Sequence, residues 1–382
     1  MYIPTEYTEH NKNVLNMKIE ILKEHLERAS HITSRVSNKN LSLPVLGAVV
    51  ISATSQKTTL RATNLDISVE VVVKAKVITE GTIAVPAAVF NQLVTATTDQ
   101  KITLTSNGHI LDFSGSHGTS KLHTLDVSEF PTLPFVKDGE GQVVNMASKD
   151  LLTALRAVSF AASSSGIRPE LSSVFLKLGA GELVAAATDS FRLAEMRLPV
   201  KTKNSTEAVL VPARNTGEII RILETGDTAE LRIGENQITF ISGGNFITSR
   251  VIDGAFPDYT AIVPKSFSTT TTMLVEDVVK TLRKVSVFTD ATGQVEFSVS
   301  KSEKKVTLRA ANAQVGETLE EVDAVFEGED MALFFNIKYI LDALSVVAAD
   351  SIVCKFSGPG KPLIISEVPN KGFTYLVMPM NR

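Results

Sequence analysis

Hydrophobic and polar residues alternate along much of the chain, in short runs that end at turn residues. Residues 102–115 and 231–254 alternate with a period of two, as β-strands do when one face is buried. Asn107-Gly108 interrupts the first run and Gly243-Gly244 interrupts the second. Because both pairs accept the positive φ angles of tight hairpin turns, the pattern predicts antiparallel sheets built from consecutive hairpins.

Three other segments carry hydrophobic residues at helical spacing, each directly after an alternating strand. The stripes are Leu22, Leu26, Ala29 and Ile32; then Leu151, Leu152, Leu155 and Val158, with Ser148 as N-cap; and Val278, Val279, Leu282 and Val285. Three further helices should start at Pro86, Pro212 and Asn336, because proline suits a first helical turn and asparagine suits an N-cap. One hydrophobic stripe per helix predicts that each helix packs on one face of a sheet.

The same order of elements occurs three times, at a spacing of roughly 125 residues, which suits a domain better than a solenoid unit. Equivalent motifs are TLRATNLD at 59–66, VAAATDSFRL at 184–193 and TLRAANAQ at 307–314, and each precedes a strand and a helix, at 83–94, 209–223 and 333–344. Pro-containing stretches at 130–141 and 256–266 mark the joins. We therefore expect a flexible extension at 1–16 and three domains of one α+β fold at 17–137, 138–264 and 265–382.

The composition is that of a globular protein, since 43% of the 382 residues are hydrophobic and 21% are charged. No apolar run approaches the roughly 20 residues that a membrane-spanning helix needs. Residues 1–16 lack the basic and apolar regions of a secretion signal, and the lone Cys354 cannot form a disulfide within the chain. These features predict a cytoplasmic protein.

The formal net charge of −4 argues against a protein that grips nucleic acid by bulk positive charge. DNA could be held only through few phosphate contacts, for example by encirclement, with a mildly basic lining balanced by an acidic exterior.

Signals of catalysis are weak. His109, His117 and His123 could lie on neighbouring strands, but no acidic residue or cysteine stands at metal-ligand spacing. SGPGKP at 357–362 lacks the first glycine of a phosphate-binding loop and the hydroxyl that would reach magnesium. Asp189 and Asp258 are isolated carboxylates that we expect to order turns. We therefore expect no enzyme, no cofactor and no metal site.

Four motifs resemble those of one family: LSLPVLG at 41–47, AATDSFRLA at 186–194, VIDGAFPDY at 251–259 and YLVMPMNR at 375–382. Together with the threefold repeat, they make residues 17–382 similar to the bacterial DNA sliding clamps, the beta subunits of DNA polymerase III. The resemblance implies three tandem domains of the DNA-clamp fold in a homodimeric ring, with sheets outside and two helices per domain lining the hole. It implies a processivity factor that encircles duplex DNA, is placed there by a clamp loader and docks polymerases and other replication and repair proteins.

In this family, partners insert a peptide with hydrophobic anchors into a pocket between the second and third domains. The matching positions here are Leu171, Thr188, Ser190, Arg192, Leu193, Pro257, Ile262, Leu376, Met378, Pro379 and Met380. Methionine is flexible and polarisable, so Met378 and Met380 could adapt to several peptides. The alternative is that VMPM is simply the last edge strand of the third domain. Phe191 and the ending Asn381-Arg382 depart from the family pattern, which puts the peptide preference in doubt.

Basic residues recur on the helices that the resemblance places toward DNA, and on two nearby loops. The DNA-facing set is Lys23, Arg28, Lys39, Asn40, Lys149, Arg156, Arg168, Arg214, Arg221, Lys280, Arg283 and Lys284. Asn40 stands where the family usually has a basic residue. The alternative is that these side chains are ordinary solvated helix faces.

For ring closure, the resemblance implies that Val89 and Leu122 of the first domain pack on Val287 and Phe288 of the third domain in a second copy. Such a contact should have an apolar centre that is buried only in the dimer. Burial within the single chain is the alternative. For the protein as a whole, the alternative function is a repeat scaffold that binds other proteins without DNA.

Overall fold

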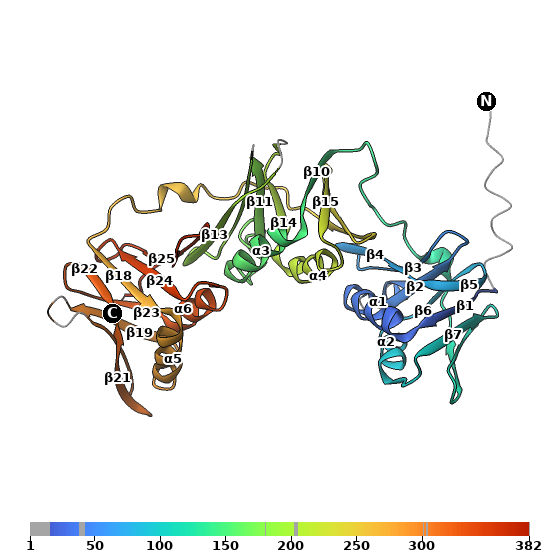
Figure 1. The fold of residues 1–382 in the computed structure, drawn as a ribbon, viewed down its shortest axis with the longest axis horizontal. Coiled ribbons are helices and arrows are strands. Elements are labelled where there is room, and N and C mark those ends of the chain that lie inside the picture. Colours follow the sequence, from blue (N-terminus) through green and yellow to red (C-terminus); the bar gives the residue numbers. More distant parts are fainter. Residues whose placement is uncertain are drawn as a thin grey trace. The chain divides into compact units, whose positions relative to one another are not determined.

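The computed structural model describes residues 16–37, 43–179, 181–201, 205–300, 302 and 305–381. These residues form 26 strands and six α-helices (Figure 1). The chain divides into two compact units, Met1–Lys149 with Gly217–Arg250 and Asp150–Thr216 with Val251–Arg382. All strand pairs between the named strands are antiparallel, as the alternating pattern predicted.

Unit 1 contains two sheets. The five-stranded sheet has the order β5 (Ala75–Thr79), β1 (Lys18–Leu22), β7 (Lys101–Ser106), β8 (Ile110–Ser114) and β9 (Thr119–His123). The eight-stranded sheet has the order β10 (Gln142–Ala147), β15 (Thr228–Ile233), β16 (Gln237–Ser242), β17 (Asn245–Arg250), β4 (Ile67–Val73), β3 (Thr58–Thr63), β2 (Ala48–Ala53) and β6 (Gly81–Pro86). Strand β17 of the second sequence repeat pairs with β4 of the first, so one sheet continues across two repeats.

Unit 2 repeats this arrangement. Its nine-stranded sheet has the order β14 (Val209–Pro212), β11 (Ser173–Gly179), β12 (Glu182–Thr188), β13 (Arg192–Pro199), β26 (Phe373–Val377), β25 (Leu363–Val368), β24 (Ser351–Phe356), β18 (Thr269–Leu274) and β22 (Val325–Gly328). Its four-stranded sheet has the order β21 (Gly316–Asp323), β20 (Lys305–Asn312), β19 (Gln294–Ser300) and β23 (Met331–Asn336). Here β13 of the second repeat pairs with β26 of the third.

The helices fall where the spacing predicted them. They are α1 (Lys23–Val36), α2 (Ala87–Ala96), α3 (Ser148–Val158), α4 (Ala213–Leu223), α5 (Val275–Ser286) and α6 (Ile337–Leu344). The Asn336 side chain accepts hydrogen bonds from the amides of Lys338 and Tyr339, which confirms it as an N-cap. Pro86 is itself the N-cap of α2, and Pro212 ends β14 just before α4.

One helix stripe is shorter than predicted. Leu26, Ala29 and Ile32 are buried, whereas Leu22 is 46% exposed because it is the N-cap residue and its side chain points away from the core. Helix α1 packs on α2 and on β3 and β4, so the stripe faces a sheet as expected. The fold class, α+β with antiparallel sheets and two helices per repeat, is confirmed.

The repeat extends to unusual backbone angles. Leu65 and Ser190 are the non-glycine residues with positive φ among those described, at 74° and 80°. They follow Asn64 and Asp189, which are equivalent positions in the first two repeats. Because a side chain in this left-handed region is strained, finding it twice at one repeat position shows that the two turns are built alike.

Candidate functional site

The turn between β12 and β13 is organised by Asp189. Its Oδ1 accepts hydrogen bonds from the amides of Phe191 (2.9 Å) and Arg192 (3.0 Å), and the Thr188 hydroxyl donates to the Arg192 carbonyl at 2.6 Å. Asp189 therefore orders a turn, as predicted. The turn leaves Phe191 63% exposed while Arg192 is buried.

Arg192 ties this turn to helix α6. Its Nε lies 2.9 Å from Asp189 Oδ2, and its Nη1 lies 2.8 Å from Asp342 Oδ2. Nη2 donates to the Phe160 carbonyl at 3.0 Å, and the guanidinium lies 4.3 Å from the Tyr339 ring centroid. A buried guanidinium is tolerated only when its charge and its donors are satisfied in this way. Arg192 therefore has a structural role beneath the turn.

Leu193, the next residue along β13, belongs to an apolar cluster. Leu193 lies opposite Leu376 of β26, which lies opposite Ile364 of β25, and all three are buried. The half-buried side chains that pack against these three residues are Tyr259, Val263 and Met378. The Met378 amide donates to the Phe191 carbonyl at 2.8 Å, which fixes the C-terminal segment beside the turn. Three predicted pocket residues are thus brought together: Leu193, Leu376 and Met378.

The remaining predicted pocket residues differ in accessibility. Leu171 and Thr188 are buried, Ser190 is exposed and Ile262 is 53% exposed. Pro257, Pro379 and Met380 are half-buried. The Met380 amide donates to the Phe334 carbonyl at 2.7 Å, so the backbone at this methionine runs beside β23. Among the predicted pocket residues, Ile262 therefore has the most exposed apolar side chain, and Met378 is half-buried.

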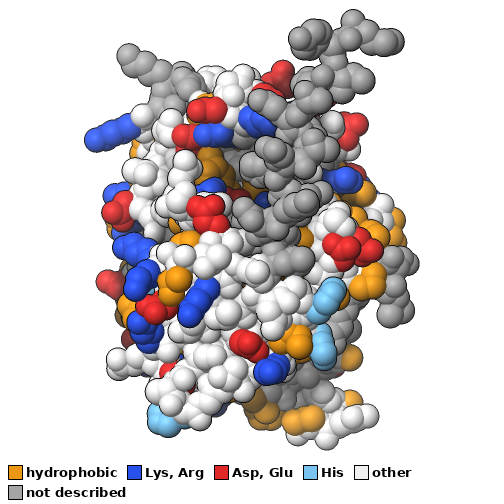
Figure 2. Space-filling model, turned by 90° about the vertical axis from the view of Figure 1, so that its right-hand side faces the viewer, with side chains coloured by type: hydrophobic (Ala, Val, Ile, Leu, Met, Phe, Trp, Pro, Cys, Tyr) orange, Lys and Arg blue, Asp and Glu red, His pale blue; other side chains and the backbone are white. Residues whose placement is uncertain are grey.

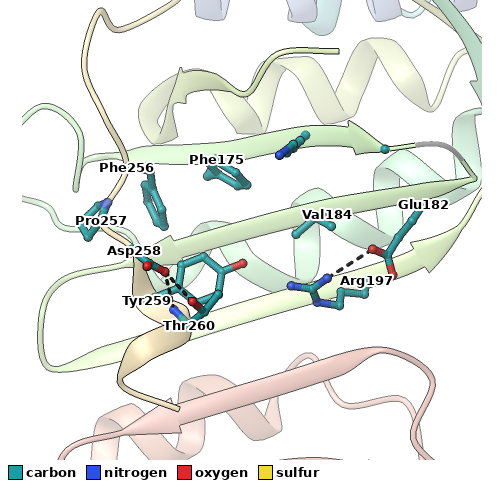
Figure 3. Close-up of a pocket in the computed structure, with 11 residues that line it drawn as sticks. Phe175, Glu182, Val184, Arg197, Phe256, Pro257, Asp258, Tyr259 and Thr260 are labelled. Carbon is teal, nitrogen blue, oxygen red and sulfur yellow. Dashed lines mark hydrogen bonds and ion pairs between the residues drawn. The ribbon is translucent and has the colours of Figure 1, made fainter. Parts of the chain in front are cut away.

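A groove of about 450 Å³ adjoins this cluster on the same sheet (Figure 3). Its residues are Phe175, Lys177, Gly179, Glu182, Val184, Arg197, Phe256, Pro257, Asp258, Tyr259 and Thr260. Figure 3 shows the rings of Phe175, Phe256 and Tyr259 at one end and the Glu182–Arg197 ion pair, 3.3 Å long, at the other. Asp258 accepts hydrogen bonds from the amide and hydroxyl of Thr260, so it also orders a turn, as predicted.

Several residues of this region were missed by the sequence interpretation. Tyr259 stands in the motif at 251–259, which was a signal for it. Val263 and Ile364 have no local signal, because their place in the cluster depends on the path of the connecting segment and on the register between β25 and β26. Asp342 and Tyr339 likewise reach Arg192 only through the packing of α6.

The predicted DNA-facing residues are mostly exposed, but acidic neighbours compensate several of them. Lys280 pairs with Glu276 at 2.5 Å, Lys284 with Glu320 at 2.7 Å and Arg221 with Glu218 at 3.1 Å. The further pairs are Lys23 with Glu27 and Arg168 with Glu170. The exposed members, paired or not, are Arg28, Lys149, Arg156, Arg168, Arg214, Lys280, Arg283 and Lys284, whereas Lys23 and Arg221 are half-buried. Lys39 and Asn40 lie outside the described residues.

The helices are nevertheless more basic than the rest of the chain. The six α-helices carry 11 Lys and Arg against seven Asp and Glu, whereas the whole chain carries 38 against 42. On the face seen in Figure 2, basic and acidic side chains are interspersed. The helices therefore carry the positive charge that the chain as a whole lacks.

The residues predicted for ring closure lie near strands that end their sheets. Val89 and Val287 are 52% and 64% exposed, and Phe288 is half-buried. Leu122 of β9 is only 6% exposed, so its side chain belongs to the core of unit 1. Strands β9 and β21 are the last strands of the five-stranded and four-stranded sheets.

The structure adds no sign of metal chemistry in the part of the chain that it describes. No group of three or more His, Cys, Asp or Glu side chains could hold an ion there. His117 contacts Asp99 at 3.1 Å. None of the described helices is long and apolar enough to cross a membrane.

Comparisons with known proteins agree over most of the chain. Models of the N-terminal, central and C-terminal domains of the DNA polymerase III beta subunit match residues 17–134, 145–258 and 260–381. The beta sliding clamp of Synechocystis is 29% identical over 389 residues, covering 95% of this chain and 99% of the relative. The beta sliding clamp of Caulobacter vibrioides is 26% identical over 375 residues, covering 95% and 100%.

Solved structures show the same fold. The DNA polymerase III beta subunit of Thermotoga maritima superposes with a TM-score of 0.89 at 24% identity, covering 96% of this chain and 100% of that one. A sliding clamp of Pseudomonas aeruginosa bound to griselimycin gives a TM-score of 0.88 at 24% identity, with the same coverage.

Proposed function

Since this chain belongs to the DNA polymerase III beta subunit family, the bacterial sliding clamps, we propose that two copies close into a ring around duplex DNA. Members of this family are processivity factors and not enzymes, and DNA and the polymerase are their partners. The protein is therefore a DNA polymerase processivity factor. The observation that carries the proposal is the set of three consecutive family domains over residues 17–381.

Exposed edges support ring closure between two copies. A strand that ends a sheet leaves backbone groups free to pair with another chain, and natural proteins normally protect such edges. Strand β9 carries Lys121 and His123, whereas β21 carries Glu317, Glu320 and Glu321. The three glutamates already pair with Arg309, Lys284 and Lys305 of the same chain, so the proposal relies on the apolar side chains: the exposed Val89 and Val287 would supply the centre of the interface. If β9 of each copy pairs with β21 of the other copy, the two head-to-tail contacts close the ring.

The charge distribution supports topological holding of DNA. Net positive helices in an acidic protein can make weak, sequence-independent phosphate contacts. Such contacts alone would give low affinity, which favours sliding. A closed ring stays on DNA because leaving requires an interface to open, so a clamp loader is needed for entry.

The apolar cluster around Leu193, Leu376 and Met378 is the proposed docking site for polymerases and other replication and repair proteins. Met378 and the exposed Ile262 offer apolar surface that can adapt to different peptides. We also place the protein in the cytoplasm, where the single, buried Cys354 stays reduced.

A topological experiment tests the ring. The protein is loaded onto nicked circular DNA by a clamp loader, and the circle is then cut with a restriction enzyme. A ring stays on the circle and slides off the linear ends. Retention on linear DNA would contradict encirclement, and a scaffold that does not bind DNA would not remain even on the circle.

A further inference from the structure

The groove at Phe175, Phe256 and Tyr259 shares a sheet face with the proposed docking site. Side chains two residues apart on a strand point to the same side, so Leu193, Glu195 and Arg197 of β13 share one face. Glu195 lies opposite Ala186 of β12, which lies opposite Phe175 of β11. The face therefore runs without interruption from the apolar cluster at Leu193 to the floor of the groove.

The connecting segment after β17 forms a common wall between the two sites. Tyr259 packs against the cluster of Leu193, Ile364 and Leu376 and also lines the groove. Its hydroxyl donates to Glu195, and both burial and this hydrogen bond raise the pKa of Tyr259. The ring of Tyr259 is thus held by the apolar cluster and its hydroxyl by Glu195. These two contacts fix the wall of the groove in the folded chain.

The groove offers an aromatic end and one cation without an ionic partner among the described residues; its Asp258 carboxylate accepts hydrogen bonds from Thr260. Phe256 packs on Phe175 with ring centroids 5.2 Å apart, and Tyr259 meets Phe256 edge-on at 5.9 Å. The Arg197 guanidinium is occupied by Glu195 at 2.8 Å and by Glu182 at 3.3 Å. Lys177 is exposed and has no hydrogen-bonding or ionic side-chain partner among the residues that the structure describes. An apolar side chain next to a carboxylate would satisfy both features.

We propose that this groove is a second docking subsite, which takes the segment of a partner polypeptide that flanks the residues held at Leu193, Leu376 and Met378. The flanking segment should carry one apolar or aromatic residue and one acidic residue that reaches Lys177. This inference rests on the docking site proposed above.

The distance between the two sites and the effective concentration of a tethered segment favour the flanking residues of the same peptide over a separate partner. Positions 193 and 197 are four residues apart on β13, or about 13 Å at roughly 3.3 Å per residue, which four or five extended peptide residues can span. Once the anchors are bound, the flank meets the groove at a high effective concentration, so modest contacts are enough.

The test compares peptides of two lengths on the full chain by fluorescence anisotropy. The short probe is a labelled Ser-Leu-Ser-Leu-Phe peptide. The long probes add Gly-Ser-Asp-Asp-Trp at its C-terminus or Trp-Asp-Asp-Ser-Gly at its N-terminus. We expect one long probe to bind about tenfold more tightly than the short probe.

Variants separate the two sites. Lys177→Glu should remove most of the gain of the long probe and leave the short probe unchanged, whereas Lys361→Glu, an exposed charge reversal in the same unit, should change neither. Phe175→Ser should also abolish the gain. Met378→Ala should weaken both probes, because it alters the anchor site.

Two failures can be told apart. If the short probe binds but neither extension adds affinity, or if Lys177→Glu leaves the gain intact, the second subsite is refuted while the docking site stands. If no probe binds the unmodified chain, the docking site itself is refuted and the second subsite falls with it.

Discussion

Arg192 and Asp342 are separated by 150 positions in the chain, yet Nη1 of the arginine lies 2.8 Å from Oδ2 of the aspartate. The contact joins the turn after β12 in the second repeat to helix α6 in the third. Because Arg192 is only 9% exposed, the pair is largely shielded from water. Such a contact can hold two repeats of unit 2 in register.

Removing the Arg192 side chain should destabilise the protein strongly. Arg192→Ala leaves the carboxylates of Asp189 and Asp342 without their buried partner, and breaking a buried pair in this way typically costs about 3 kcal/mol or more. Urea denaturation monitored by circular dichroism measures the change. Arg309→Ala is the matched control, because Arg309 pairs with Glu317 on the exposed surface and its loss should cost under about 1 kcal/mol. Equal losses for the two variants would contradict the buried role of Arg192.

The contribution of Asp342 should depend on pH. Burial alone would raise the pKa of Asp342, but hydrogen bonds from Lys338 and Arg192 outweigh it and hold the pKa below its ordinary value of 3.8. A folded-state pKa below the unfolded one stabilises the protein above that unfolded value, and the stabilisation is lost as pH falls through the folded pKa. Asp342→Asn should therefore cost stability at pH 7, and the difference from the unmodified protein should shrink below about pH 4. A difference that stays constant over this range would contradict the ionic role.

Removing the acidic partner of Lys280 on α5 should strengthen the binding of the protein to DNA. Lys280 is held 2.5 Å from Glu276 in the first turn of α5, and both are exposed. Glu276→Gln releases Lys280 for a phosphate, so the slope of log affinity against log salt for a labelled duplex should steepen by about 0.9. Glu235→Gln, in the turn between β15 and β16, removes the same charge outside the helices. If both variants change the salt slope equally, the effect comes from net charge alone, and a contact between α5 and DNA is contradicted.

A charge at Val287 should prevent self-association. Val287 is 64% exposed in the single chain, and we place it at the apolar centre of the interface between copies. Val287→Asp would bury a carboxylate there, which should weaken the dimer by about 3 kcal/mol, or roughly 100-fold. Light scattering should show a fall from twice 41.2 kDa toward 41.2 kDa. Val325→Asp, at a position 71% exposed on β22, is the control and should leave the mass unchanged.

Relieving the strained turn at Leu65 should stabilise unit 1. Leu65 has φ 74° and is 45% exposed, so Leu65→Gly removes a steric penalty and little buried surface. A gain of about 0.5 kcal/mol is expected, because the added freedom of glycine in the unfolded chain offsets part of the relief. Val72→Gly, in the regular strand β4, should instead lower stability. Loss of stability in Leu65→Gly would show that its partly buried side chain matters more than the backbone angle.

Local features of the fold could be predicted because they depend on neighbours in sequence. Gly243 and Gly244 have φ 57° and 80° and close the hairpin between β16 and β17, and the Asn336 side chain caps α6. Asp189 and Asp258 order turns through amides two or three residues away. In each case the residue type determines the outcome within a few positions.

The composition of the candidate site could be predicted only in part. Leu193, Leu376 and Met378 meet as expected, but Ile364 and Val263 complete the cluster through strand register and a connecting segment. Arg192 stays a prediction for the pocket; its buried contacts with Asp342 and Tyr339 depend on the packing of α6 and have no local signal in the sequence. Leu122 is part of a core whose extent depends on how the sheets pack.

The sheets that continue from one repeat into the next also constrain how this gene can change. The middle repeat contributes β10 and β15–β17 to the sheet of unit 1, and β11–β14 to the large sheet of unit 2. A fragment cut at the repeat boundaries would expose the pairing edges of both β17 and β13, and should aggregate when expressed alone. Recombination that exchanges a single repeat would break two strand pairings at once. Inheritance should therefore keep neighbouring repeats together, and substitutions at the β17–β4 and β13–β26 seams should arise as matched pairs.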